Sequence, residues 1–415
     1  MWLTSNKYLD DMLKTMYNFS STSRGVLRSM YYFMFLPGIV LSTILHNKFS
    51  LRTTLLIVTL IITAGALFKL LTTVHHAFLF IGQGLWTLTH PSIIFASALV
   101  AVNWFEDSKR VLMLSIFVSF SFTAYINGFG FSTLVADYVD RAVTNIRLKL
   151  LVLYLVKAIF WIVVLLILYI TFESEPKYPP SQSSWATRDD DVIGTYRQLC
   201  LNRQFMLLTF SQVFYYIMLT SLDFNFDNIW RVYKIKQSQA DEIRIISTVS
   251  GLFGSLALGI FLHYTKMYKT ANILTGVLSI WSLIAILLYL PKSITGVCIM
   301  NIFYGFSKYL ILTIWYIYWL EIAYPLKETT VLGFIALPSI ILGHGIGFIS
   351  TYFISKNESK RSICVFVSLM CFSAAIGVIL AWFMKPVNYH KIRYSDVGKN
   401  FFIVMMYRDW VIYST

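Results

Sequence analysis

Residues 148–182 read LKLLVLYLVKAIFWIVVLLILYITFESEPKYPPSQ and contain the two features that decide the fold, a long apolar run and the polar segment after it. The run Leu148–Phe172 exceeds the about 20 residues with which a helix, rising about 1.5 Å per residue, crosses the hydrocarbon core of a membrane. The polar segment continues to Gln204 and includes Pro179-Pro180 and three aspartates at 189–191, a composition typical of a linker. We therefore predict a membrane-spanning helix that ends here and a loop that follows it.

The composition of the whole chain is that of a membrane protein. Hydrophobic residues make up 57% of the 415 residues and charged residues 13%, against roughly 45–50% and 25% in soluble domains. The net charge of +14 would suggest a nucleic-acid partner in a soluble protein, but the lysines and arginines are scattered through short loops. We therefore expect contact with lipid headgroups and no nucleic acid. The four cysteines lack metal-ligand spacing, so no metal site or disulfide framework is predicted.

Apolar runs of this length occur eleven times, five before the polar segment and six after it. We expect an all-α polytopic membrane protein in which a central cytoplasmic loop at 173–204 joins an N-terminal half-bundle at 26–172 to a C-terminal half-bundle at 205–384, with a polar segment at 1–25 and a tail at 385–415. Two six-helix halves joined by a central loop are the plan of many secondary transporters, which hold the solute between the halves. The first half here is one span short. The predicted spans are Val26–His46, Thr53–Val74, Ala77–Phe105, Val111–Val135, Leu148–Phe172, Phe205–Phe226, Ile243–Tyr264, Thr270–Leu290, Ser293–Tyr324, Thr329–Ser355 and Arg361–Met384.

Short motifs along the chain occur in the order found in one family of membrane proteins. Glu175-Pro176-Lys177-Tyr178-Pro179-Pro180-Ser181-Gln182 resembles the opening of the central loop in the feline leukaemia virus subgroup C receptor-related family, which belongs to the major facilitator superfamily. The resemblance covers roughly residues 12–385. It implies the major facilitator fold and transport of a small organic solute such as choline, ethanolamine or haem. The other matching motifs are Gly65–Lys69, Trp104-Phe105 with Arg110, Leu262–Lys269, and Glu321–Pro325 with Gly333.

The resemblance aligns Val26–His46 with the family's second helix, so we expect the first helix, which lines the central cavity in such transporters, to be absent. Either the chain is a truncated product or gene model, which we favour, or it lacks one wall of the cavity. An aromatic residue and two glutamines shared by the family's choline transporters correspond here to Thr220, Phe122 and Ile340. The loop signature after the second helix departs from the superfamily pattern at Asn47.

Three ionisable residues lie near the middle of predicted spans, where a charge costs about 2.5–3.5 kcal/mol on insertion scales. His90 and Lys308 occupy equivalent helices of the two halves in the family alignment, and His344 lies on a later span. We predict that all three contact solute or act in gating. The structural alternatives are that His90 binds a backbone carbonyl freed by Pro91, that Lys308 pairs with a carbonyl or a phenol such as Tyr304, and that the helix around His344 merely packs closely through its glycines.

Aromatic residues near these positions could form a cage for a cation. An aromatic face attracts a quaternary ammonium with about 0.5–2 kcal/mol per ring. The candidates are Trp86, Tyr309, Trp315, Tyr316, Tyr318 and Trp319. Packing against lipid is the alternative. Lys308 would repel a cation unless it is neutralised or turned away, and would favour an anionic or haem-like solute. Lys69 lies near a span end, and we expect it to extend toward the interface.

The leading hypothesis is a facilitator-type secondary transporter working by alternating access, with Arg110 and Glu321 as gating residues. The sequence holds no P-loop, dinucleotide fingerprint or zinc-protease helix, so we predict no enzyme and no cofactor. The rival is a transport-inactive paralogue that acts as a receptor or interaction partner. We expect a multi-pass protein of the plasma membrane, with a mitochondrial or other organelle membrane as the alternative, and the sequence gives no oligomeric state.

Overall fold

Every regular element in the described part of the chain is a helix. The computed structural model describes Tyr17 and residues 21–121, 145–177, 180, 191–323 and 326–385. The helices are α2 (Ser21–Lys48), α3 (Leu51–Leu70) with the 3-10 turn Leu71–Thr73, α4 (Ala77–Trp104), the segment Arg110–Ser121, α6 (Ile146–Thr171), α7 (Val192–Leu201), α8 (Arg203–Val232), α9 (Gln237–Thr265), α10 (Tyr268–Tyr289), α11 (Ile294–Ile322), α12 (Glu328–Lys356) and α13 (Lys360–Trp382).

Nine of the described helices are long and apolar enough to cross a membrane, from α3 to α13 without α7. The helix α2 is 28 residues long but is not among these nine. The segment Arg110–Ser121 is the described beginning of the predicted span Val111–Val135, whose remainder lies outside the described residues. The predicted all-α polytopic fold is confirmed, while the count of eleven spans stays a prediction.

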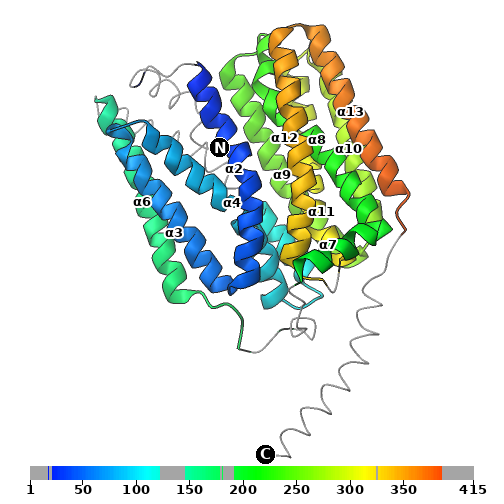
Figure 1. Cartoon of the computed structure of the whole chain (residues 1–415). Helices are drawn as coiled ribbons and strands as arrows, with labels where there is room; N and C mark the ends of the chain where they lie inside the picture. Colours follow the sequence, from blue (N-terminus) through cyan, green and yellow to red (C-terminus); the bar gives the residue numbers. More distant parts are fainter. Residues whose placement is uncertain are drawn as a thin grey trace, which may run out of the picture.

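The helices form two groups that lie side by side (Figure 1). In the first group α2 packs on α4, α4 on α3 and α3 on α6. In the second group α11 packs between α9 and α10, and α10 also packs on α13. The helix α8 packs on both α13 and α12. Contacts between α2 and α12 join the two groups. The short helix α7, which lies within the predicted central loop, packs on α8 and α12 at one end of the bundle.

Small residues set the closest helix pairs. Lipid tails are as apolar as leucine side chains, so helices in a membrane gain little from burial alone and associate where backbones can approach. A side chain on Gly305 of α11 would collide with the carbonyl of Ser247 on α9, and one on Gly82 of α4 would collide with the carbonyl of Gly65 on α3. These glycines therefore fix the pairs α9–α11 and α3–α4.

The predicted extension of Lys69 toward the interface is wrong. Its side chain is buried, and Nζ donates a hydrogen bond to Oε1 of Gln83 at 2.8 Å. The reason is local: Gly82 and Gly65 bring α4 so close to α3 that the stem of Lys69 lies against Gly82. The amide of the next residue, Gln83, then supplies the acceptor that a buried ammonium requires.

Candidate substrate cavity

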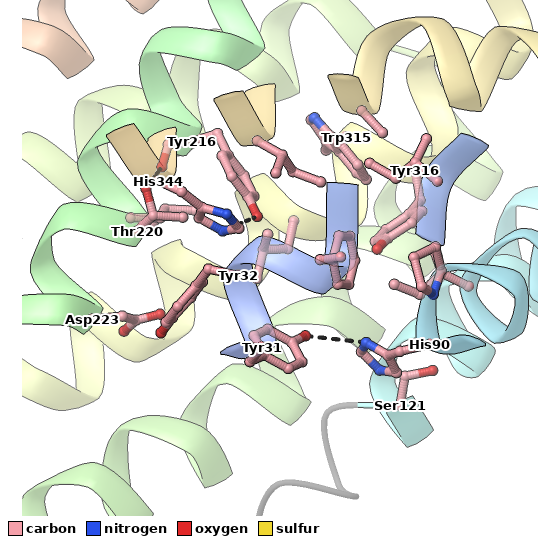
Figure 2. Close-up of a pocket in the computed structure, with 18 of the residues that line it drawn as sticks. Tyr31, Tyr32, His90, Ser121, Tyr216, Thr220, Asp223, Trp315, Tyr316 and His344 are labelled. Carbon is pink, nitrogen blue, oxygen red and sulfur yellow. Dashed lines mark hydrogen bonds between the residues drawn. The ribbon is translucent and has the colours of Figure 1, made fainter. Parts of the chain in front are cut away.

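A cavity lies between the two helix groups and is lined by α2, α4, the segment Arg110–Ser121, α8, α11 and α12 (Figure 2). The volume open to the centres of water molecules is about 170 Å³. One water needs about 10–15 Å³ on that measure, so the cavity has room for many waters or a small solute. The polar and aromatic residues that line it include Tyr31, Tyr32, His90, Tyr216, Thr220, Asp223, Phe224, Lys308, Trp315, Tyr316 and His344.

An ion pair between Lys308 and Asp223 lies at the cavity wall. Lys308 Nζ on α11 lies 2.6 and 2.8 Å from the two carboxylate oxygens of Asp223 on α8. The Asp223 side chain is 42% exposed and the Lys308 side chain 15%. The alternative partner of Lys308, Tyr304, is not used, since its hydroxyl makes no hydrogen bond. The pair therefore neutralises the charge that would repel a cation.

His90 reaches the cavity from α4 and is held by α2. Its Nδ1 lies 3.1 Å from the hydroxyl of Tyr31, the bond drawn in Figure 2. The indole of Trp86 stacks on the imidazole, with ring centroids 5.3 Å apart and an angle of 19°. Trp86 is therefore a support for His90 and is not among the lining residues. The partner of His90 is a phenol of the neighbouring helix, so the alternative of a carbonyl freed by Pro91 is not what the structure shows.

His344 reaches the cavity from α12 and is held more loosely. The hydroxyl of Tyr216 lies 3.4 Å from its Nε2, and the ring of Tyr32 meets the imidazole edge-on with centroids 4.6 Å apart (Figure 2). The residue is 7% exposed, yet its Nδ1 makes no hydrogen bond. A buried polar atom without a partner costs about 1–3 kcal/mol. This nitrogen is therefore a point where a water or a solute would gain a hydrogen bond.

Of the six predicted cage residues, Trp315 and Tyr316 line the cavity, and the other four do not. Trp315 is parallel to Tyr216, with ring centroids 6.2 Å apart and an angle of 18°, and meets Tyr316 edge-on. Tyr309 is buried beneath the ion pair, with its ring centroid 5.8 Å from Lys308 Nζ. Tyr309 therefore supports the lysine and does not face a solute.

Several lining residues were missed by the sequence analysis although their spacing follows one helix face. Tyr31, Phe35 and Ile39 recur every four residues on α2, and all of them line the cavity. Tyr216 and Phe224 lie two turns apart on α8, with Thr220, already named as the counterpart of the family's aromatic residue, between them at the same spacing. A search for polar and aromatic residues at this period would have found both faces.

The two predicted gating residues do not meet each other. Arg110 is buried at the start of its helical segment, where Nη1 pairs with Asp107 at 2.5 Å and Nη2 donates to the carbonyl of Val102 at 2.9 Å. Glu321 is buried near the end of α11 and forms none of the ion pairs found in the described residues. Arg110 therefore ties neighbouring parts of the first half together, and a gating role for either residue stays a prediction.

Hydrogen bonds of Asn47 join the two halves at the end of the bundle where α7 lies, here named the linker side. The Asn47 amide donates to Oγ1 of Thr330 at 3.2 Å and accepts from Oγ1 of Thr329 at 2.6 Å, so the last turn of α2 is bonded to the first turn of α12. On the same side Tyr196 of α7 packs edge-on against Phe334, and burial raises the pKa of this phenol, which keeps it uncharged. Asn47 is one of the positions that depart from the superfamily loop signature.

The comparisons with known proteins agree with this architecture. The model of the Major Facilitator Superfamily matches residues 8–339. The chain is 23% identical to the human protein named choline/ethanolamine transporter FLVCR2 over 390 residues, which cover 91% of this chain and 72% of that protein. It is 27% identical to choline/ethanolamine transporter FLVCR1 of Felis catus over 189 residues, 42% of this chain and 32% of the relative.

Solved structures share the fold. The fucose:proton symporter FucP of E. coli superimposes with a TM-score of 0.69 at 13% identity over 93% of this chain and 96% of its own. The proton:xylose symporter XylE superimposes with a TM-score of 0.67 at 11% identity, with 92% of each chain covered. The predicted resemblance is confirmed, and these relatives and structures are named as transporters or symporters rather than enzymes. The chain belongs to the Major Facilitator Superfamily.

Proposed function

We propose that this chain is a secondary transporter that moves a small organic cation of the choline or ethanolamine type by alternating access between its two half-bundles. The observation that carries the proposal is a central cavity in which the one lysine among the described lining residues is neutralised by a carboxylate. The relatives named as choline/ethanolamine transporters support the same solute class.

The charges of the cavity favour a cation over an anion. Lys308 is engaged by both oxygens of Asp223, and the carboxylate is the more exposed partner. An entering cation therefore meets negative charge first. A haem-like solute, with a large macrocycle and two carboxylates, would need a wider space and a lysine or arginine that is not already paired, and the described lining offers neither.

Aromatic rings supply the rest of a cation site. Tyr32 lies against Phe224, with ring centroids 4.1 Å apart, at the end of the cavity away from the linker side. Tyr216, two turns before Phe224 on α8, lies parallel to Trp315 of α11 and continues the aromatic lining toward the linker side (Figure 2). Each aromatic face adds roughly 0.5–2 kcal/mol of attraction for a desolvated cation. The quaternary ammonium of choline, which is weakly hydrated and of small volume, suits such a lining.

The two ends of the cavity are closed by different kinds of contact, which suits alternating access. Asn47 closes the linker side through hydrogen bonds to α12. At the other end the halves meet through rings: Tyr32 on Phe224, and Phe33 stacked on Phe348 at 5.5 Å. Ring contacts can slide apart without leaving unpaired polar groups, so we expect the aromatic end to open first.

Uptake into vesicles tests the proposal. The purified full chain is reconstituted into liposomes and offered labelled choline and labelled ethanolamine, with fucose as an uncharged control solute and protein-free liposomes as the background. We expect saturable uptake of at least one of the two cations and none of fucose. Uptake no greater than that of protein-free liposomes, by protein shown to be folded, would defeat the proposal and favour the non-transporting receptor instead.

A further inference from the structure

We propose that Asp223 is the group that binds the ammonium of the solute, and that Lys308 is a tethered competitor which occupies Asp223 when the cavity is empty. The cavity then selects amines that carry N–H groups over quaternary ammonium ions. This inference rests on the proposed function, because it concerns the same cavity, and it narrows the class of solute.

The geometry leaves one side of the carboxylate open. Asp223 lies on α8 and lines the cavity, where Figure 2 shows it on the same wall as Thr220. Its side chain is 42% exposed although both oxygens bond Lys308. An ionised carboxylate has about four lone-pair sites, so two bonds to one ammonium do not exhaust it. A second donor can therefore reach Asp223 before Lys308 leaves.

Thr220 supplies a further acceptor one helical turn before Asp223. Its hydroxyl donates its hydrogen to the carbonyl of Tyr216 at 2.7 Å, so the oxygen's remaining lone pair is directed elsewhere. Both residues are on the cavity-lining face of α8. A primary ammonium carries three N–H groups and can bond Asp223 and Thr220 together, whereas a quaternary ammonium has no N–H and gains only contacts with the rings.

Lys308 shows that the site accepts a primary ammonium. Its Nζ is chemically the same group as the head of a small alkylamine, held at 2.6 and 2.8 Å from the carboxylate and at 5.8 Å from the ring centroid of Tyr309. The four-carbon stem allows this group to move away when another ammonium takes its place. The exchange keeps at least one positive charge on Asp223 at every stage, so no bare carboxylate is left in the cavity.

Competition between Lys308 and an amine for Asp223 predicts how much the amine affinity changes when Lys308 is removed. Apparent affinity equals intrinsic affinity multiplied by the fraction of molecules whose site is free. If Lys308 occupies Asp223 in about nine-tenths of empty molecules, its removal strengthens amine binding about tenfold. An ion pair that serves only to join α8 and α11 would give the opposite sign, because its loss would loosen the cavity.

Binding of a matched pair of probes tests the proposal. Methylammonium and tetramethylammonium carry the same charge, and only the first has N–H groups. Calorimetric titrations use the full chain in lipid nanodiscs as wild type, Lys308→Met, and the charge-neutral double variant Asp223→Asn with Lys308→Met. The control is Asp227→Asn, which breaks the 2.9 Å pair between Asp227 and Arg244 one turn further along α8, outside the cavity lining.

We expect Lys308→Met to bind methylammonium about tenfold more tightly. The double variant should lose at least tenfold for methylammonium and keep tetramethylammonium within threefold, and the control should match wild type for both probes. Equal losses for both probes in the double variant, weaker methylammonium binding by Lys308→Met, or no binding of either probe by wild type would each overturn the inference. If the wild-type chain takes up choline but the variants bind the two probes with the same selectivity as wild type, the inference fails and the proposed transport stands. If the probes bind selectively as expected but the chain takes up neither choline nor ethanolamine, the proposed transport fails and the inference stands.

Discussion

Lys69 in the first half-bundle and Lys308 in the second both lie inside the molecule, but they differ in partner and in access. Lys69 donates to a neutral amide, Gln83, between two helices that glycines hold in close contact. Lys308 pairs with a carboxylate that is 42% exposed to the cavity. A lysine that is buried between packed helices can stabilise only one arrangement of those helices. A lysine at a cavity wall can separate from its partner, because water in the cavity can solvate both groups. The first is therefore a structural group and the second a candidate for function.

Removal of the amide is the change that we expect to have the largest effect. Gln83→Leu leaves the ammonium of Lys69 buried with no acceptor from α4, a situation that costs about 3 kcal/mol or more. We expect a clear fall in melting temperature in detergent, with the uptake rate per folded molecule unchanged. The double variant Lys69→Met with Gln83→Leu should recover most of the loss, since the two apolar side chains fill the same space.

An unchanged melting temperature for Gln83→Leu would contradict the proposed difference between Lys69 and Lys308. A Gln83→Leu protein as stable as wild type would mean that Lys69 reaches water or another acceptor in the membrane. Its burial between α3 and α4 would then no longer separate it from Lys308.

Lys308→Met should have a much smaller effect on stability. The carboxylate of Asp223 can be hydrated from the cavity once its partner is gone, and exposed ion pairs contribute only about 0.2–1 kcal/mol. We expect a melting temperature within a few degrees of wild type, measured in the same detergent as Gln83→Leu. A loss as large as that of Gln83→Leu would show that the pair mainly holds α8 to α11.

The sequence contains the fold but not these two pairings. Apolar runs of membrane-spanning length and the polar segment at 173–204 predicted a two-part helical bundle, because the thickness of the bilayer sets helix length directly. Mid-span ionisable residues also predicted positions at the cavity for His90, Lys308 and His344, since such groups are costly in contact with lipid.

What the sequence did not show is which residue each polar group would face. Asp223 and Lys308 are 85 positions apart on helices with little direct contact, and their meeting depends on the rotation of α8 and α11 about their own axes. Lys69 was misplaced because its distance from the span end suggested access to water, while the decisive feature was the pair of glycines that draws α4 over it. Trp86 and Tyr309 were assigned to the cavity wall because composition cannot distinguish a lining ring from the ring behind it.

The two ends of the cavity differ as well, because hydrogen bonds of Asn47 join the halves at the linker side and aromatic rings join them at the other end. Asn47→Ala removes two hydrogen bonds between α2 and α12, each worth about 0.5–1.5 kcal/mol net. We expect the linker side to open about tenfold more often, which corresponds to about 1.4 kcal/mol. The measurement is the labelling rate of Ser97→Cys, a cavity-lining position, by an impermeant thiol reagent applied from the linker side of vesicles in a background without the native cysteines.

Ser50→Ala is the matched control for that experiment. Ser50 caps α3 by accepting a hydrogen bond from the backbone of Thr53, so its loss weakens the same loop without touching a contact between the halves. Equal labelling rates for Asn47→Ala, Ser50→Ala and the parent would show that the Asn47 bonds do not hold the linker side closed.

The smallest expected effect is a difference in stability between variants of His90, in the first half, and His344, in the second. Phenylalanine preserves the ring contacts of either residue. His90→Phe loses a 3.1 Å hydrogen bond to Tyr31, worth about 1 kcal/mol. His344→Phe loses a 3.4 Å contact at the outer limit of hydrogen-bond length and a nitrogen that has no partner, so we expect a change below about 0.5 kcal/mol. Melting temperatures of the two variants, measured without solute, give the order. If His344→Phe proves the more costly, its imidazole must be held by water inside the empty cavity, and binding of an amine solute would then have to displace that water as well as Lys308.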